Sequence, residues 1–220
     1  EIDRKKIFIV VTETSDAVAI YVGRDCLSYG NVIRRKIILD IQPYASGRDV
    51  KGVYIDDQAS GVVVRGNIFA RVQQPVFIGG GRDNVIEENL FYRSSPVVHL
   101  DARGVEGQRE NTFNPKGTLL KRLNSIPYKD QPFVERFPNL PKLRDDDFGM
   151  PKYNVFKSNR VVDSGGERVS VQARAGLEID SNVVLTESAF LVTKRPAERQ
   201  SWGDFRFKNS VLDVSEFGVK

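Results

Sequence analysis

The chain has 220 residues, of which 40% are hydrophobic and 28% are charged, as expected for one soluble domain with a sizeable buried core. The net charge of +4 is small and spread along the chain, so it says little about nucleic acid, and the apolar runs are too short to span a bilayer. One cysteine, Cys26, and one histidine, His99, exclude an internal disulfide and a histidine-rich metal site.

The first predicted strand is an apolar, extended segment at residues 7–11 that has no clear cap. The chain contains no signal peptide and does not begin with methionine. We therefore interpret residues 1–220 as a single domain that belongs to a longer protein. The missing signal peptide leaves secretion open.

Two kinds of short apolar strand alternate along the chain. The first kind starts with a short apolar strand and turns at a polar pair. It occupies residues 31–38, 62–69, 84–91 and 154–161, with a degraded copy from residue 182. The second kind occupies residues 20–24, 53–57, 76–80 and 98–102. The apolar spacing is two, and the copies repeat about every 22 residues where no insertion intervenes. This rhythm predicts an all-β fold, a right-handed single-stranded parallel β-helix with coils of about 22 residues.

Asparagines fall at one point of the first strand type in three copies. They are Asn67, Asn89 and Asn159, and Lys36 takes their place in the first copy. Amide side chains both donate and accept hydrogen bonds, so asparagines at one corner of successive coils can form a ladder. We expect a structural role for these residues rather than a catalytic one.

Two insertions interrupt the repeat. The shorter covers residues 42–51, and the longer is an inserted loop at residues 103–152 with five prolines among aromatic and charged residues. A loop of this length in a compact fold is usually functional or contacts a partner. We expect a helix over residues 116–124 and a last strand over residues 202–208.

Alignment of the second strand type places Gly23, Asp56, Gly79 and Asp101 at one position. Strand alternation turns Asp56 and Asp101 outward on one face, with backbones about 9–10 Å apart across two rungs. Gly79 lies on the rung between them and has no side chain. We therefore expect two carboxylates that flank a bare floor on which a sugar ring can lie.

Glycoside hydrolysis uses two carboxyl groups, about 5–5.5 Å apart for retention of configuration and about 6.5–9.5 Å apart for inversion. Asp57 offers a third carboxyl group beside Asp56, so the stereochemical outcome stays open. The alternative interpretation is structural. In it, Asp56 and Asp57 form a turn, and Asp101 is the ion-pair partner of Arg103.

Further residues near these acids are candidates for substrate binding. His99 shares the outward face with Tyr54 and can act as an acid, a base or a sugar ligand, or be a surface histidine. Arg82 and Arg103 follow strands at turns, where they bind substrate or hold the turn through an ion pair with aspartate. Tyr54 can stack on a sugar face or lie buried.

Several motifs are familiar: Gly-Val-Tyr-Ile-Asp-Asp at 52–57, Ser-Gly-x-x-Val-x-Gly-Asn-Ile-Phe at 60–69 and His-Leu-Asp-Ala-Arg-Gly at 99–104. Over residues 17–220 the chain resembles bacterial β-helix proteins of the pectate-lyase-like superfamily, and within it the β-helix glycoside hydrolases with α-fucosidase and xylanase activities. The resemblance implies a catalytic aspartate pair on neighbouring coils, at Asp56 or Asp57 and at Asp101. It also implies a longer protein with further coils before residue 1.

Three functions are compatible with these residues. The leading one is a secreted or periplasmic glycoside hydrolase that cleaves a polysaccharide with an aspartate pair and needs no cofactor. The second is a polysaccharide lyase, which needs a base from Lys51, His99 or Arg103 and Ca²⁺ held by aspartates. The third is a non-catalytic glycan-binding or structural module. The expected partner is a polysaccharide or oligosaccharide, not nucleic acid or a membrane, and the sequence does not indicate the oligomeric state.

Overall fold

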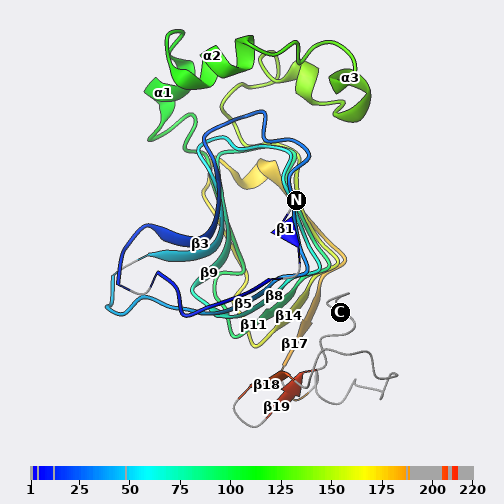
Figure 1. Ribbon diagram of the computed structural model, residues 1–220. Coiled ribbons are helices and arrows are strands. Elements are labelled where there is room, and N and C mark those ends of the chain that lie inside the picture. Colours follow the sequence, from blue (N-terminus) through cyan, green and yellow to red (C-terminus); the bar gives the residue numbers. More distant parts are fainter. Residues whose placement is uncertain are drawn as a thin grey trace.

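The computed structural model of the protein describes residues 2–3, 5–11, 13–47, 49–186, 188, 205–207 and 210–212. Short strands stack into three sheets, and within each sheet every pair of neighbours runs parallel. Figure 1 looks along the stack and shows the three sheets around one interior. The chain is therefore a parallel β-helix, as its repeats predict.

Each coil contributes one strand to each sheet until the last, which adds strands to two of them. Sheet A contains β1 (Ile2–Asp3), β4 (Val32–Arg34), β7 (Val63–Arg65), β10 (Val85–Glu87), β13 (Asn154–Lys157) and β16 (Leu177–Asp180). Sheet B contains β2 (Lys6–Phe8), β5 (Ile37–Ile41), β8 (Ile68–Val72), β11 (Leu90–Tyr92), β14 (Arg160–Val162) and β17 (Val183–Leu185). Sheet C contains β3 (Ala17–Gly23), β6 (Val50–Asp56), β9 (Gln74–Gly79), β12 (Val98–Asp101) and β15 (Glu167–Val169).

The interior is filled by like side chains stacked from coil to coil. Ile55, Ile78 and Leu100 occupy one register position of sheet C and are fully buried. Phe69 and Phe91 stack in sheet B with ring centroids 5.1 Å apart. Burial of each such side chain stabilises the fold by about 1.5–3 kcal/mol, so the repeated apolar positions supply the core.

An asparagine ladder closes the corner between sheets A and B. The backbone N and Nδ2 of Asn67 both donate to Asn89 Oδ1 at 3.0 Å, and Asn89 makes the same two bonds to Asn159. The expected ladder is confirmed. Asn182 continues it by accepting two bonds from Asn159. The degraded copy at residue 182 is thus shifted in register, because Asn182 aligns with the corner rather than with the start of the repeat.

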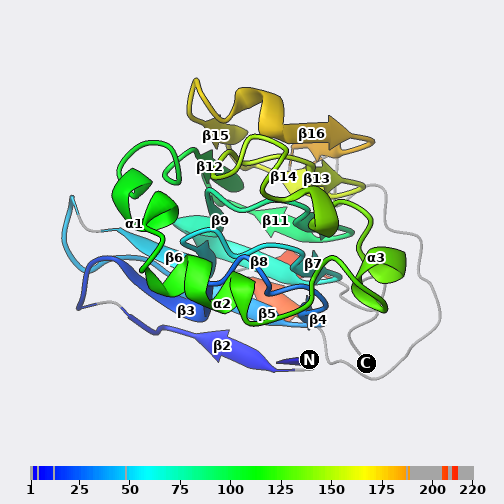
Figure 2. The same cartoon turned by 90° about the horizontal axis from the view of Figure 1, so that it is seen from above.

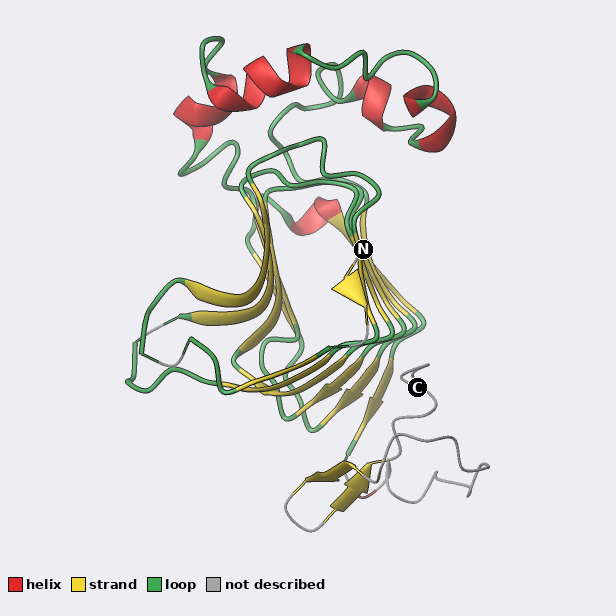
Figure 3. Cartoon of the chain, in the orientation of Figure 1, coloured by secondary structure: helices red, strands yellow, loops and turns green. Residues whose placement is uncertain are grey.

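Both insertions are present with small changes at their ends. The shorter runs between β5 and β6, so Lys51 belongs to a strand rather than to the insertion. The longer connects β12 to β13 and holds α1 (Arg109–Phe113), α2 (Thr118–Asn124), α3 (Phe133–Arg136) and the 3₁₀ turn η1 (Leu140–Lys142). The helix expected over residues 116–124 is α2. Figure 3 shows these helices together on one side of the solenoid.

A separate small core fixes the longer insertion to the solenoid. Leu120, Leu123 and Tyr128 of the insertion pack with Cys26 and Leu27, which lie between β3 and β4. The 3₁₀ turn η2 (Arg174–Gly176) lies further along, before β16. In the described part of the chain, no helix has the length and apolarity needed to cross a membrane.

A short antiparallel hairpin follows the last coil. It pairs β18 (Phe205–Phe207) with β19 (Ser210–Leu212) and belongs to none of the three solenoid sheets. The strand expected over residues 202–208 is therefore present at residues 205–207. Trp202 and Lys208 lie outside the described residues.

Candidate functional site

The carboxyl ends of the sheet C strands bring the predicted acids onto one wall. Gly23 pairs in register with Asp56, and Asp101 pairs with Gly79. Because Ile55, Ile78 and Leu100 precede these positions and face the core, Asp56 and Asp101 face outward on the same side. The alignment made from the sequence is thus confirmed at these positions.

The floor between the two acids is not bare. A Cβ carbon placed on Gly79 would lie 2.8 Å from Cζ and from Nε of Arg103, closer than real Cβ contacts. The guanidinium therefore lies directly over Gly79 and occupies the space expected for a sugar ring. A side chain at position 79 would overlap this guanidinium, so the position requires glycine.

Arg103 ties the acids together through hydrogen bonds. Its Nη1 donates to Asp56 Oδ1 at 2.6 Å, to Tyr54 OH at 2.6 Å and to Asp57 Oδ1 at 3.3 Å. Its Nη2 donates to Asp101 Oδ2 at 2.8 Å, and its Nε reaches Asp101 Oδ1 at 3.0 Å. The ion pair between Asp101 and Arg103, the structural alternative for this site, is confirmed. Burial acts to lower the pKa of Arg103, but the bonds and charge of Asp101 and then Tyr54 raise it overall.

Asp56 and Asp57 are neighbours in different surroundings. Asp56 is buried and accepts hydrogen bonds from Tyr21 OH at 2.8 Å, from the backbone N of Asp57 at 2.8 Å and from Arg103. Asp57 is more exposed, at 22% of its side chain, and has the longer bond to Arg103. Burial and then the charge of Asp56 raise the pKa of Asp57, against the opposing effect of Arg103. Adjacent carboxyl groups in such unlike settings are suited to different chemical roles.

Rings stack along the outer face of sheet C, beside the acids. Tyr54 and Phe77 are parallel with centroids 4.9 Å apart, and Phe77 and His99 are parallel at 4.2 Å. Tyr21 meets Tyr54 edge to face at 5.9 Å. Tyr54 and Phe77 are each only 6% exposed, so Tyr54 supports Arg103 rather than offering its face to a sugar.

His99 ends this row as a neutral side chain. Its Nδ1 lies 3.3 Å from Gln74 Oε1, and burial lowers the pKa of His99 to about 4, although the charge of Asp101 acts to raise it. A histidine with this pKa is uncharged near neutral pH and holds its place by stacking.

Arg82 lies apart from the acids. Its side chain is 2% exposed, and it donates from Nη2 to the backbone oxygen of Asp146 at 2.7 Å and from Nη1 to Asp146 Oδ2 at 3.2 Å. Its partner is thus an aspartate of the insertion rather than its neighbour Asp83, and the pair fastens the insertion to the solenoid. The structure does not bring Arg82 to the predicted site.

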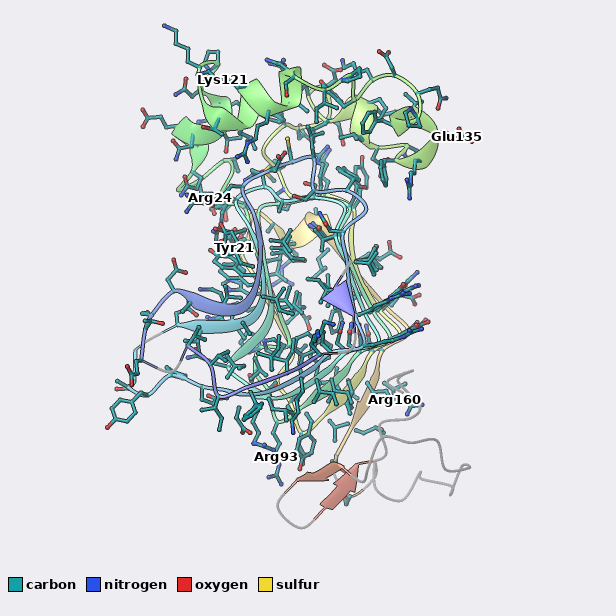
Figure 4. All side chains as sticks on the ribbon, in the orientation of Figure 1. Tyr21, Arg24, Arg93, Lys121, Glu135 and Arg160 are labelled. Atoms are coloured by element: carbon teal, nitrogen blue, oxygen red, sulfur yellow. The ribbon has the colours of Figure 1, made fainter. Side chains whose placement is uncertain are left out.

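A pocket of about 380 Å³ opens beside Asp57. The solenoid side of its wall is formed by Arg24, Asp57 and Gln58, and the other side by α1, α2 and the residue before α1. Figure 4 labels Tyr21 and Arg24 on the side of the solenoid that the insertion overhangs. Asp57 is therefore the carboxyl group of the cluster that a ligand in this pocket meets.

The sequence pointed to only part of this site. Tyr21, which donates to Asp56, shares the register position of Tyr54, so alignment of the first copy of the repeat was the signal for it. The pocket residues of the insertion, among them Gln108, Asn111 and Arg122, lie outside any repeat, and no local pattern marks them.

The residues do not fit the calcium site that a lyase would need. A cation, the guanidinium of Arg103, already lies between Asp56 and Asp101. Over the described ranges, no group of three or more His, Cys, Asp or Glu side chains is arranged to hold a metal ion. Lys51, a candidate base, is fully buried and pairs with Asp49 at 2.7 Å.

Comparison of the chain with models of protein families, with curated proteins and with solved structures gives no match.

Proposed function

We propose that the protein is a glycoside hydrolase in which Asp57 protonates the leaving sugar oxygen. The observation that carries this proposal is the position of Asp57, which lines the pocket. Its contacts with Arg103 at 3.3 Å and with Arg24 at 3.5 Å are longer than those of Arg103 with Asp56 and Asp101, at 2.6 and 2.8 Å. A carboxyl group acts as a general acid when its surroundings keep it protonated. Burial and the neighbouring charge of Asp56 raise the pKa of Asp57 in this direction.

Asp101 is the second carboxyl group of the proposal, as base or nucleophile. One guanidinium bridges it to Asp57, at 2.8 Å on the Asp101 side and 3.3 Å on the Asp57 side. The nearest oxygens of Asp57 and Asp101 can be no further apart than these two hydrogen bonds plus the width of the guanidinium group. Their separation therefore stays below the upper limit of the range, roughly 5–9.5 Å, over which carboxyl pairs hydrolyse glycosidic bonds.

The resemblance to the β-helix glycoside hydrolases supports the same pair of residues. In that group the implied catalytic aspartates lie on neighbouring coils. Here Asp57 directly follows β6 and Asp101 ends β12 of the same sheet, with β9 between the two strands. We therefore include α-fucosidase and xylanase activities among those to be tested. The proposed substrate is a polysaccharide or oligosaccharide.

A second candidate is a glycan-binding module without catalysis. The observation that favours it is the neutralisation of Asp56 and Asp101 by Arg103, which is 17% exposed and bound by both. An arginine that neutralises a cluster of acids can also serve the fold alone. In this case the pocket binds sugar and no bond is broken.

A screen for released reducing sugar over fucosylated, xylan and pectic substrates tests the proposal. The native chain is compared with Asp57→Asn and Asp101→Asn, and with Asp145→Asn as control, since Asp145 is exposed and pairs with Lys129 in the insertion. We expect both site variants to lose about 10²–10⁴-fold in rate and the control to keep full activity.

Other outcomes of this screen separate the candidates. Equal activity in all four proteins contradicts the assignment of Asp57 and Asp101 as the catalytic pair. Glycan binding without turnover in the native chain supports the binding module. Release of unsaturated sugars that absorb ultraviolet light identifies a lyase instead.

A further inference from the structure

The pocket beside Asp57 is closed on one side by the insertion. Its far wall consists of Gln108, Asn111 and Thr112 around α1 and of Thr118, Leu119 and Arg122 of α2. Figure 2 looks down on the insertion and shows α1 and α2 lying over β3 and β6. The insertion leaves the solenoid after β12 and returns across the stack, so its helices stand over the carboxyl ends of earlier strands.

The insertion that carries this wall is attached to the solenoid at two places. Arg122 Nη1 donates to the backbone oxygen of Arg24 at 3.2 Å and lies 3.7 Å from Asp25 Oδ2. Leu120 and Leu123 of α2 are buried against Cys26 in the small core. At the other end, Arg82 holds Asp146. Apolar contacts together with the hydrogen bonds of the buried Arg82 fix the insertion to the solenoid.

The lining offers polar groups that a sugar ring can bind. Gln108, Asn111 and Thr118 present amide and hydroxyl groups, and Arg24 and Arg122 add guanidinium donors, which suit the hydroxyl groups of a sugar. The volume of about 380 Å³ lies at the lower end of the roughly 300–1,000 Å³ of ligand pockets. Such a volume holds one or two sugar rings, and the helices α1 and α2 stand on one side of it.

We propose that the pocket binds the terminal sugar of a glycan, and that the protein acts on chain ends rather than on internal bonds. This inference rests on the proposed hydrolase function, because it places the scissile bond at the mouth of the pocket next to Asp57. The fixed wall of α1 and α2 stops the sugar chain at one side. The rest of the glycan leaves the pocket over the outer face of sheet C.

Product analysis tests the direction of cleavage. Oligosaccharides of six or more units, labelled at the reducing end, are taken from any substrate that the screen finds to be cleaved. We expect release of mono- or disaccharide from the first time point, with a ladder of labelled products that shortens by one or two units. Random internal fragments at early times overturn the inference and leave the hydrolase proposal standing.

A pair of variants tests the pocket itself. Asn111→Trp fills the space between α1 and Asp57, and we expect at least a tenfold loss of activity on chain ends. Glu110→Trp is the matched control, because Glu110 is the preceding, exposed residue of the same helix and does not line the pocket. Equal activity of the two variants overturns the inference.

A binding readout separates failure of the inference from failure of the proposed function. Methyl glycosides of fucose, xylose and galacturonic acid are titrated into the protein while the side-chain amide resonances of Gln108, which both proteins contain, are followed by NMR. A shift that Asn111→Trp abolishes, in a chain that cleaves nothing, supports the pocket and contradicts the hydrolase. Cleavage without any shift at saturating sugar contradicts the pocket and supports the hydrolase.

Discussion

Gly79 lies beneath the guanidinium of Arg103, so close that a Cβ carbon at position 79 would come within 2.8 Å of Arg103 Cζ. The two residues come from neighbouring parts of the wall, one in β9 and the other just after β12. Because Arg103 is held by Asp56, Asp101 and Tyr54, it cannot turn away without loss of several hydrogen bonds. The absent side chain of Gly79 thus decides whether the acid cluster can form.

Gly79→Ala is expected to displace Arg103 and to destabilise the protein by about 1–3 kcal/mol, the usual cost of an overpacked site. The activity proposed above should fall with it, since the acids lose their shared cation. Urea unfolding measures the first effect and the reducing-sugar assay the second. Gly107→Ala is the control, because a Cβ carbon there meets nothing within 4 Å. If Gly79→Ala matches Gly107→Ala in both assays, the close approach of Arg103 to Gly79 contributes neither to stability nor to activity.

The pH dependence of hydrolysis should report Asp57. An acid that works in its protonated form loses activity as the pH rises through its pKa, and the pKa of Asp57 is raised by burial and then by the charge of Asp56. Asp56→Asn removes that charge, so the alkaline limb of the kcat/KM profile is expected to move to lower pH. Asp16→Asn, an exposed aspartate that pairs with Lys51, should leave the limb in place. An unmoved limb in Asp56→Asn would assign the titration to another group.

Asn89→Ala should be among the most destabilising changes at the corner of the solenoid. Asn89 is fully buried, accepts from Asn67 and donates to Val64 O at 2.9 Å and to Asn159 Oδ1 at 3.0 Å. Each buried group left without a partner costs about 1–3 kcal/mol. Urea unfolding should show a loss well above that of Asn31→Ala, whose side chain is exposed and makes a local bond to Ser28 O. Comparable losses of unfolding free energy in the two variants would show that the asparagine ladder adds nothing special to stability.

His99 should make the fold less stable as the pH falls below neutrality. Its folded pKa of about 4 lies below the ordinary value near 6.5, so the unfolded chain takes up the proton first as the pH drops between these values. His99→Phe keeps the stack on Phe77 without a titrating group, and the difference in unfolding free energy between the two proteins should change over this range. NMR titration of the imidazole gives the pKa directly. A measured pKa near 6.5 would show that partial burial does not shift the titration of His99.

The repeat determined the fold from the sequence alone. Positions such as Ile78 and Leu100 recur with a spacing that only stacked coils can bury, and Asn67 and Asn89 recur at a corner that only a ladder can satisfy. The same alignment placed Asp56 and Asp101 on one wall. These features follow from the periodicity of the sequence, which can be recognised without knowing which distant residues are in contact.

The tertiary structure alone decided what lies between the acids and what faces them. Whether Arg103 extends into solvent or folds back over Gly79 depends on three partners from two coils, and no spacing along the chain encodes that choice. The pocket beside Asp57 exists because the insertion crosses back over earlier coils and packs on Cys26. Residues outside the repeat, such as Asn111, gain their place from that packing, so their part in the site becomes visible only in three dimensions.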